Sequence, residues 1–116
     1  ILLDYMLAKS ISLIDNLIVY PENMLENLNK TRGLVFSQKV LLKLTEVGAS
    51  REEAYKIVQN SAMVVWRDKS KNLLNELLER GDALNFLSEV ELRTIFDDKK
   101  VLQNIDYIFN RTIDKD

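Results

Sequence analysis

Apolar side chains recur at helical spacing along most of the chain. In residues 1–19 they fill about half of a helical wheel, and charged or amide side chains occupy the rest. A surface helix needs an apolar stripe only somewhat wider than about 100°, so a stripe this wide indicates contact with more than one neighbouring helix. The pattern leaves open whether those neighbours belong to a monomeric bundle or to other subunits. The apolar positions are Leu2, Leu3, Met6, Leu7, Ile11, Leu13, Ile14, Leu17 and Ile18.

The only proline of the chain, Pro21, interrupts this pattern. Proline disfavours helical geometry at the preceding Tyr20 and is well placed as the first residue of a new helix. We therefore predict a first helix that ends near Val19. A second helix is predicted over about residues 21–30, followed by a turn at 31–33.

The rest of the chain also has helical patterns, and two of them begin with a capping box. Ser50 and Ser88 each stand three residues before a glutamate, so hydroxyl and carboxylate can bond reciprocally to the helix start. Gly48 and Gly81 follow apolar periodic segments and are natural helix stops. We predict helices over 34–47, 50–68, 72–80, 88–96 and 98–111, and no strand, which makes the fold all-α. The predicted buried face of residues 50–68 consists of Ala54, Ile57, Val58, Ala62, Val65 and Trp66.

Composition narrows the class of protein. A chain of 116 residues with 47% apolar and 29% charged residues suits one globular domain. The net charge of −2 and the absence of a basic stripe argue against nucleic-acid binding. Asp4, Lys9 and Asp15 interrupt the first apolar segment and argue against a membrane span. The absence of cysteine fits a cytoplasmic protein, and without histidine this chain cannot form a Ser–His, Cys–His or His–metal site.

Few side chains stand out as candidates for chemistry. The acidic pairs at 52–53 and 97–98 are explained as helix starts, and no set of convergent carboxylates predicts a metal site. Arg32 lies beside Gly33 in a predicted turn, and turns often carry binding residues. We favour a structural bond from Arg32 to helix-end carbonyls and retain it as the single weak candidate for substrate binding. No residue is a candidate for catalysis or cofactor binding.

The chain opens at Ile1, already inside an apolar periodic segment, without a polar lead-in or cap. We therefore expect it to be a fragment of a longer protein.

A family resemblance adds a function to this pattern. Residues 19–59, VYPENMLENLNKTRGLVFSQKVLLKLTEVGASREEAYKIVQ, resemble the C-terminal region of the adenylosuccinate lyase family, within the fumarase/aspartase superfamily. The preceding ILLDYMLAKSISLIDNL is similar to the distal end of that family's long bundle helix. The segment LQNIDYIFNR near the end is similar to its closing helix. Residues 61–97 match mainly in helical pattern.

The resemblance implies both an architecture and an activity. Residues 1–19 would be the distal end of a central-bundle helix, and residues 20–116 a helical C-terminal domain, in a homotetramer. The family eliminates fumarate from adenylosuccinate, giving AMP, and from the succinylcarboxamide intermediate of purine synthesis. A serine acts as base and a histidine protonates the leaving nitrogen, and no cofactor is needed.

The catalytic parts of the family do not carry over to this chain. The signature loop with Ser-Ser-x-Met-Pro-x-Lys-x-Asn-Pro character is missing, and so is every histidine. General acid and base steps contribute about 10²–10⁴-fold each, so we expect the chain alone to be inactive. We expect it to self-associate through residues 2–18. The alternative is a stand-alone helical interaction module that uses residues 1–19 as a docking helix, and the reading frame upstream of Ile1 would separate the two.

Overall fold

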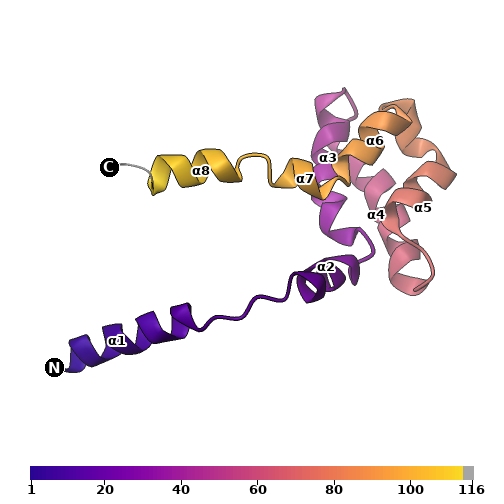
Figure 1. Ribbon diagram of the computed structural model, residues 1–116. Coiled ribbons are helices and arrows are strands. Elements are labelled where there is room, and N and C mark those ends of the chain that lie inside the picture. Colours follow the sequence, from indigo (N-terminus) through magenta and orange to yellow (C-terminus); the bar gives the residue numbers. More distant parts are fainter. Residues whose placement is uncertain (114–116) are drawn as a thin grey trace.

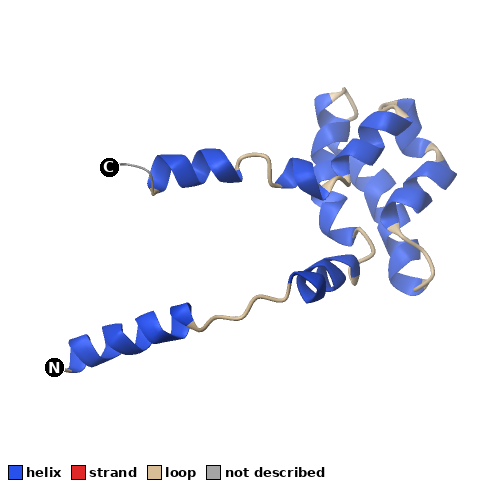
Figure 2. Cartoon of the chain, viewed as in Figure 1, coloured by secondary structure: helices blue, strands red, loops and turns tan. Residues whose placement is uncertain are grey.

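The computed structural model describes residues 1–113, and every regular element within that range is a helix (Figure 2). The all-α prediction is therefore confirmed, and residues 114–116 of the predicted C-terminal domain lie outside the described range. The α-helices are α1 (Leu2–Asp15), α2 (Pro21–Asn29), α3 (Ser37–Glu46), α4 (Arg51–Arg67), α5 (Leu73–Arg80), α6 (Glu89–Ile95), α7 (Asp98–Val101) and α8 (Ile105–Thr112). Short 3₁₀ helices cover Leu34–Phe36 and Asp82–Asn85.

One apolar core holds α3 to α6 together. Helix α4 lies between α3 and α5 and packs against both, because small and branched residues recur along its inner face. Burying such side chains removes apolar area from water, which is the main favourable contribution to folding. The buried apolar residues are Val40, Leu44, Ala49, Ala54, Val58, Val65, Leu73, Leu77, Ala83, Leu87 and Leu92.

Both predicted capping boxes are present. The Ser50 hydroxyl accepts a hydrogen bond from the Glu53 amide at 3.2 Å, and the Glu53 carboxylate accepts one from the Ser50 amide at 3.0 Å. The same reciprocal pair joins Ser88 and Glu91 at the start of α6. These bonds use amides that have no partner inside the helix, so they fix where α4 and α6 begin.

The predicted end of the first helix is wrong by one turn. Helix α1 ends at Asp15 rather than near Val19, while α2 begins at Pro21 as predicted. The Asn16 side chain donates to the Ser12 carbonyl at 2.7 Å, and asparagine side chains that bond locally compete with helix continuation. Residues 17–20 have no regular structure, so the joint between the two helices is an extended segment and not a single kink.

The single helix predicted over 98–111 is also wrong. The chain forms α7 and α8, separated by a turn in which the Ile105 amide donates to the Leu102 carbonyl at 3.0 Å. Asn104 stands immediately before α8, and asparagine favours helix starts over helix interiors.

Trp66 is not part of the buried face of α4. Its side chain is 72% exposed, whereas Val65 beside it is fully buried. Of the other predicted members, Ala54 and Val58 are buried, and Ile57 and Ala62 are partly buried against the core. Trp66 lies at the edge of the apolar stripe in the last turn of α4, where no element among the described residues covers it.

The two terminal helices extend away from the body formed by α2 to α7. Figure 1 shows α1 and α8 on the same side of that body, and the chain measures 62 × 35 × 23 Å along its principal axes. Neither helix contributes a buried residue. Within residues 1–113 no helix combines the length and the apolar character needed to cross a lipid bilayer.

Candidate functional site

The candidate turn at Arg32 has an unusual backbone. Arg32 has φ 52° and Gly33 has φ 83°, so two successive residues are left-handed. This conformation costs a non-glycine residue about 1–2 kcal/mol, so the surrounding structure must enforce it at Arg32. The Arg32 amide donates to the Asn29 carbonyl at 2.8 Å, and the Leu34 amide to the Thr31 carbonyl at 3.0 Å. These bonds reverse the chain sharply between α2 and α3.

Arg32 joins this turn to the segment between α4 and α5. Its Nη1 donates to the Asp68 carbonyl at 3.0 Å, and its own carbonyl accepts the Leu73 amide at 3.0 Å. Asp68 is the residue that caps the C-terminus of α4. The structural bond favoured from the sequence is therefore present, and it connects segments far apart along the chain.

Asp68 is itself held in place by Ser70. The Ser70 hydroxyl and amide donate to the Asp68 carboxylate at 2.7 and 2.9 Å. These hydrogen bonds, with smaller contributions from the Lys71 and Arg32 charges, hold the pKa of Asp68 below its ordinary value. The carboxylate stays ionised at neutral pH and keeps the loop ordered where Arg32 binds.

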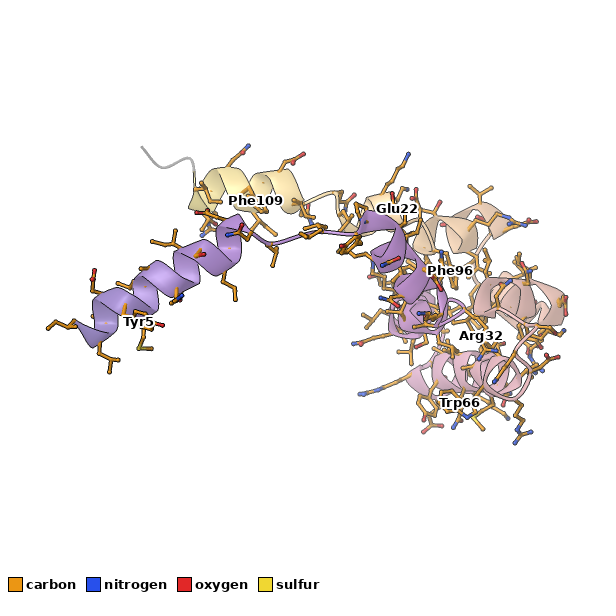
Figure 3. The ribbon with its side chains drawn as sticks, turned by 60° about the horizontal axis from the view of Figure 1, so that its bottom comes forward. Tyr5, Glu22, Arg32, Trp66, Phe96 and Phe109 are labelled. Atoms are coloured by element: carbon orange, nitrogen blue, oxygen red, sulfur yellow. The ribbon has the colours of Figure 1, made fainter. Side chains whose placement is uncertain are left out.

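A shallow hollow of about 360 Å³ lies beside the turn. On one side, the rings of Phe36 and Phe96 meet with centroids 5.2 Å apart and planes tilted by 57°. Gly33 packs so closely that an added Cβ would stand 3.1 Å from Phe96 Cε1. Figure 3 shows Arg32 and Phe96 in the body, away from Tyr5 and Phe109 on the projecting helices. The hollow is lined by Leu28, Asn29, Arg32, Gly33, Phe36, Asn72, Leu74, Phe96 and Asp98.

The hollow contains few charged groups. Its charged groups are one guanidinium and the Asp98 carboxylate, and no described part of the chain brings together three metal-ligating side chains. A guanidinium has five donors in a fixed fork, so Arg32 keeps donors beyond the one that binds Asp68. Two other polar side chains lie elsewhere: Gln38 lines a separate hollow with Tyr55, and Arg93 pairs with Glu89 at 2.7 Å.

A second candidate surface is apolar. Helix α1 exposes its whole stripe, and α2 adds Met24 and Leu25. On α8, Ile105, Ile108 and Phe109 are also exposed. Exposed apolar side chains in this number make α1 a candidate interaction surface.

Comparison with known proteins decides the family. Residues 33–112 match the family model described as adenylosuccinate lyase C-terminus. The chain belongs to the adenylosuccinate lyase family. It is 45% identical over 93% of its length to an adenylosuccinate lyase of Helicobacter pylori strain J99. It is 44% identical over 96% of its length to one of Synechocystis, and 41% identical over 92% to one of Thermotoga maritima.

The chain spans only about a quarter of these adenylosuccinate lyases. It covers 27% of the Helicobacter protein, 26% of the Synechocystis protein and 25% of the Thermotoga protein. The family match includes Gly33, α3 to α7 and α8, but begins after Arg32. Arg32 therefore stays a prediction as a substrate-binding residue.

Sequence reasoning missed the partners of Arg32. Asp68 lies 36 residues further along the chain. The Asp68–Lys69–Ser70 sequence carries a local signal for a side-chain-capped turn, because aspartate accepts from the amide two residues on. That signal could have marked the loop as ordered, but not as the partner of a turn so distant in sequence.

Proposed function

We propose that this chain is the C-terminal portion of a cytoplasmic adenylosuccinate lyase. The complete enzyme would remove fumarate from adenylosuccinate, giving AMP, and perform the same cleavage on the succinylcarboxamide intermediate of purine synthesis. The observation that carries the proposal is the family match over residues 33–112, together with similarity to named lyases over 92–96% of the chain.

Within that enzyme the chain would have two structural roles. Residues 1–19 would be the distal end of a central-bundle helix, and residues 20–116 the helical C-terminal domain. The distribution of buried residues supports this division. Among the described residues, burial begins at Val40 and ends at Leu92, and α1 has no part in it.

The chain itself would be non-catalytic. It has no histidine and no signature loop, so neither the base nor the acid of the elimination can come from its residues. The test is a comparison of the complete enzyme with residues 1–116, following fumarate release from adenylosuccinate by absorbance. The complete enzyme should turn over and residues 1–116 should not. Turnover by residues 1–116 would refute the non-catalytic role, and an inactive complete enzyme would refute the lyase assignment.

The complete enzyme would be a homotetramer, and residues 1–116 alone would self-associate through residues 2–18. The exposed stripe of α1 supports this, because so wide an apolar surface is costly to leave in water. Sedimentation should show a concentration-dependent oligomer, which Ile11→Asp should dissociate. Ser12→Asp, on the polar face, is the matched control. A strict monomer at high concentration would contradict the proposal.

Arg32 is the candidate for contact with substrate. In the complete enzyme, Arg32→Lys should raise the KM for adenylosuccinate by about tenfold, because a lysine cannot reproduce a bidentate contact. The thermal midpoint of the same variant reports loss of the Asp68 bond. A lowered midpoint with an unchanged KM would show that Arg32 acts only in structure.

A further inference from the structure

The described chain buries one ionisable side chain, Glu76 on α5. This side chain is only 8% exposed, and its Oε2 atom is closed off from solvent and accepts no hydrogen bond within the described residues. The Nζ of Lys71 stands 3.2 Å from the same oxygen. A buried charge is costly unless an opposite charge faces it, so Lys71 compensates the charge of Glu76.

Lys71 is held on α5 by a second carboxylate as well. Its Nζ donates to Glu79 Oε2 at 2.8 Å. This hydrogen bond, together with the neighbouring Glu76 carboxylate, holds the pKa of Lys71 above its ordinary value, so the ammonium stays charged at neutral pH. Lys71 itself precedes α5, and its side chain therefore ties the loop between α4 and α5 to that helix at two points.

The backbone of the same loop binds Arg32 on both sides of Lys71. The Lys71 amide donates to the Asp68 carbonyl at 3.2 Å, and the same carbonyl accepts a hydrogen bond from Arg32 Nη1 at 3.0 Å. Two residues after Lys71, the Leu73 amide donates to the Arg32 carbonyl at 3.0 Å. A displacement of Lys71 would therefore disturb the contacts of both the side chain and the backbone of Arg32.

The loop also forms part of the hollow beside Arg32. Asn72, next to Lys71, lines this hollow together with Leu74. The Asn72 side chain caps α5 by accepting a hydrogen bond from the Asn75 amide at 2.9 Å. Lys71 does not line the hollow, so any influence that it has on a bound molecule passes through the loop.

We propose that Lys71 is a positioning residue that, through its ion pair with Glu76, fixes the guanidinium of Arg32 for contact with substrate. The inference rests on the proposed role of Arg32 in binding adenylosuccinate. A side chain that binds substrate must be held in place by its own neighbours, and the loop anchored by Lys71 supplies those neighbours.

The choice of variant follows from the burial of Glu76. Lys71→Met alone would leave that carboxylate buried without an opposite charge and would destabilise α5. The test variant therefore combines Lys71→Met with Glu76→Gln, which removes both charges together. Lys43→Met is the matched control, because the ion pair of Lys43 with Glu46 is exposed and lies on α3.

The first measurement is steady-state kinetics of the complete enzyme. The Lys71→Met/Glu76→Gln variant should raise the KM for adenylosuccinate about fivefold and change kcat less than about twofold, because it weakens a binding contact and removes no reacting group. Lys71→Arg should keep the KM, since a guanidinium can also pair with two carboxylates. Lys43→Met should keep it as well. An unchanged KM in the double variant would overturn the inference.

A combination with Arg32→Lys tests whether Lys71 acts through Arg32. Added to Arg32→Lys, the two changes should raise the KM less than about twofold further, because both remove the same contact. Effects that multiply, to about fiftyfold in total, would overturn the inference. If Arg32→Lys raises the KM and the Lys71 variant does not, only the inference fails. If Arg32→Lys itself leaves the KM unchanged, the proposed substrate contact fails and the inference fails with it.

Hydrogen exchange followed by mass spectrometry tests the position of the loop directly. In the complete enzyme, a peptide that contains the Leu73 amide should exchange about fivefold faster in the Lys71→Met/Glu76→Gln variant, because the loop opens locally. A peptide that contains the Leu92 amide, which donates to the Ser88 carbonyl in α6, is the internal reference and should not change. Equal acceleration of both peptides would indicate general destabilisation and would overturn the positioning role.

Discussion

At the scale of single residues, the turn at 31–33 shows how a local strain is maintained. Arg32 occupies a left-handed conformation because both its side chain and its carbonyl are bound by the segment between α4 and α5. Gly33 follows in the same region and lies against Phe96, so that an added Cβ would stand only 3.1 Å from Phe96 Cε1. The sequence could identify the turn from Gly33. It could not identify the residues that hold it, because they lie more than thirty positions away and no spacing rule connects them.

Gly33→Ala should therefore destabilise the body more than an ordinary glycine substitution in a turn. Its positive φ alone costs about 1 kcal/mol for alanine, and the new Cβ would also press on Phe96. The measurement is the free energy of unfolding in urea. Gly81→Ala is the matched control, since Gly81 also has a positive φ, 72°, but nothing within 4 Å of its Cβ position. Equal losses in the two variants would show that the Phe96 contact is unimportant.

At the scale of elements, short-range signals predicted helix starts well and helix ends less well. Ser50 and Ser88 each carry their partner glutamate three residues away, so both caps could be identified from the sequence alone. The end of α1 depends on a competing bond from Asn16, and the break before Asn104 depends on a turn that apolar periodicity does not encode. The exposure of Trp66 depends on which element packs beside the last turn of α4, which is a tertiary property.

Ser50→Ala should lower stability by about 1 kcal/mol, because the first-turn amides of α4 lose their side-chain acceptor. Ser10→Ala is the control, since the Ser10 hydroxyl bonds only to the Met6 carbonyl within exposed α1. Equilibrium unfolding of both variants at neutral pH gives the comparison. A loss in Ser10→Ala as large as that in Ser50→Ala would contradict a capping role.

The same capping box should make stability depend on pH. Hydrogen bonds from the Ser50 side chain and then its backbone amide lower the pKa of Glu53, and Ser88 does the same for the pKa of Glu91. A lowered pKa in the folded state stabilises the protein above the unfolded pKa of about 4.3, and this stabilisation is lost as pH falls through the lower folded pKa. Stability should therefore decrease as the solution is acidified below about pH 4.5. In Ser50→Ala this decrease should be shallower, and an unchanged slope in thermal melts would argue against the cap as its source.

At the scale of the whole molecule, the body contains the apolar core, whereas α1 and α8 contribute no buried residue to it. The buried residues lie in α3 to α6 and the loops beside them, so the body does not depend on α1 for its core. The comparisons place the chain in the adenylosuccinate lyase family, and α1 and α8 leave apolar side chains exposed. The sequence predicted the wide stripe of α1 correctly, but apolar periodicity alone could not tell whether a neighbour within the chain covers it.

A shortened chain that starts at Tyr20 should have the same thermal midpoint as residues 1–116 have at low protein concentration. Its midpoint should not depend on protein concentration, because the association surface of α1 is gone. The thermal midpoint of residues 1–116 should rise with protein concentration, since association stabilises the folded state by mass action. Circular dichroism melts over a hundredfold range of concentration give the measurement. A large loss of stability in the shortened chain would show that α1 contributes to the core.

The exposed position of Trp66 has a practical consequence for such experiments. It is the single indole of the chain, and it faces solvent in the last turn of α4. The fluorescence emission of Trp66 is therefore that of a hydrated indole already in the folded protein. Unfolding will change its emission wavelength very little. A protein surface that binds over the end of α4 will remove water from the Trp66 side chain. Its fluorescence emission will then shift to shorter wavelength, so Trp66 reports such binding.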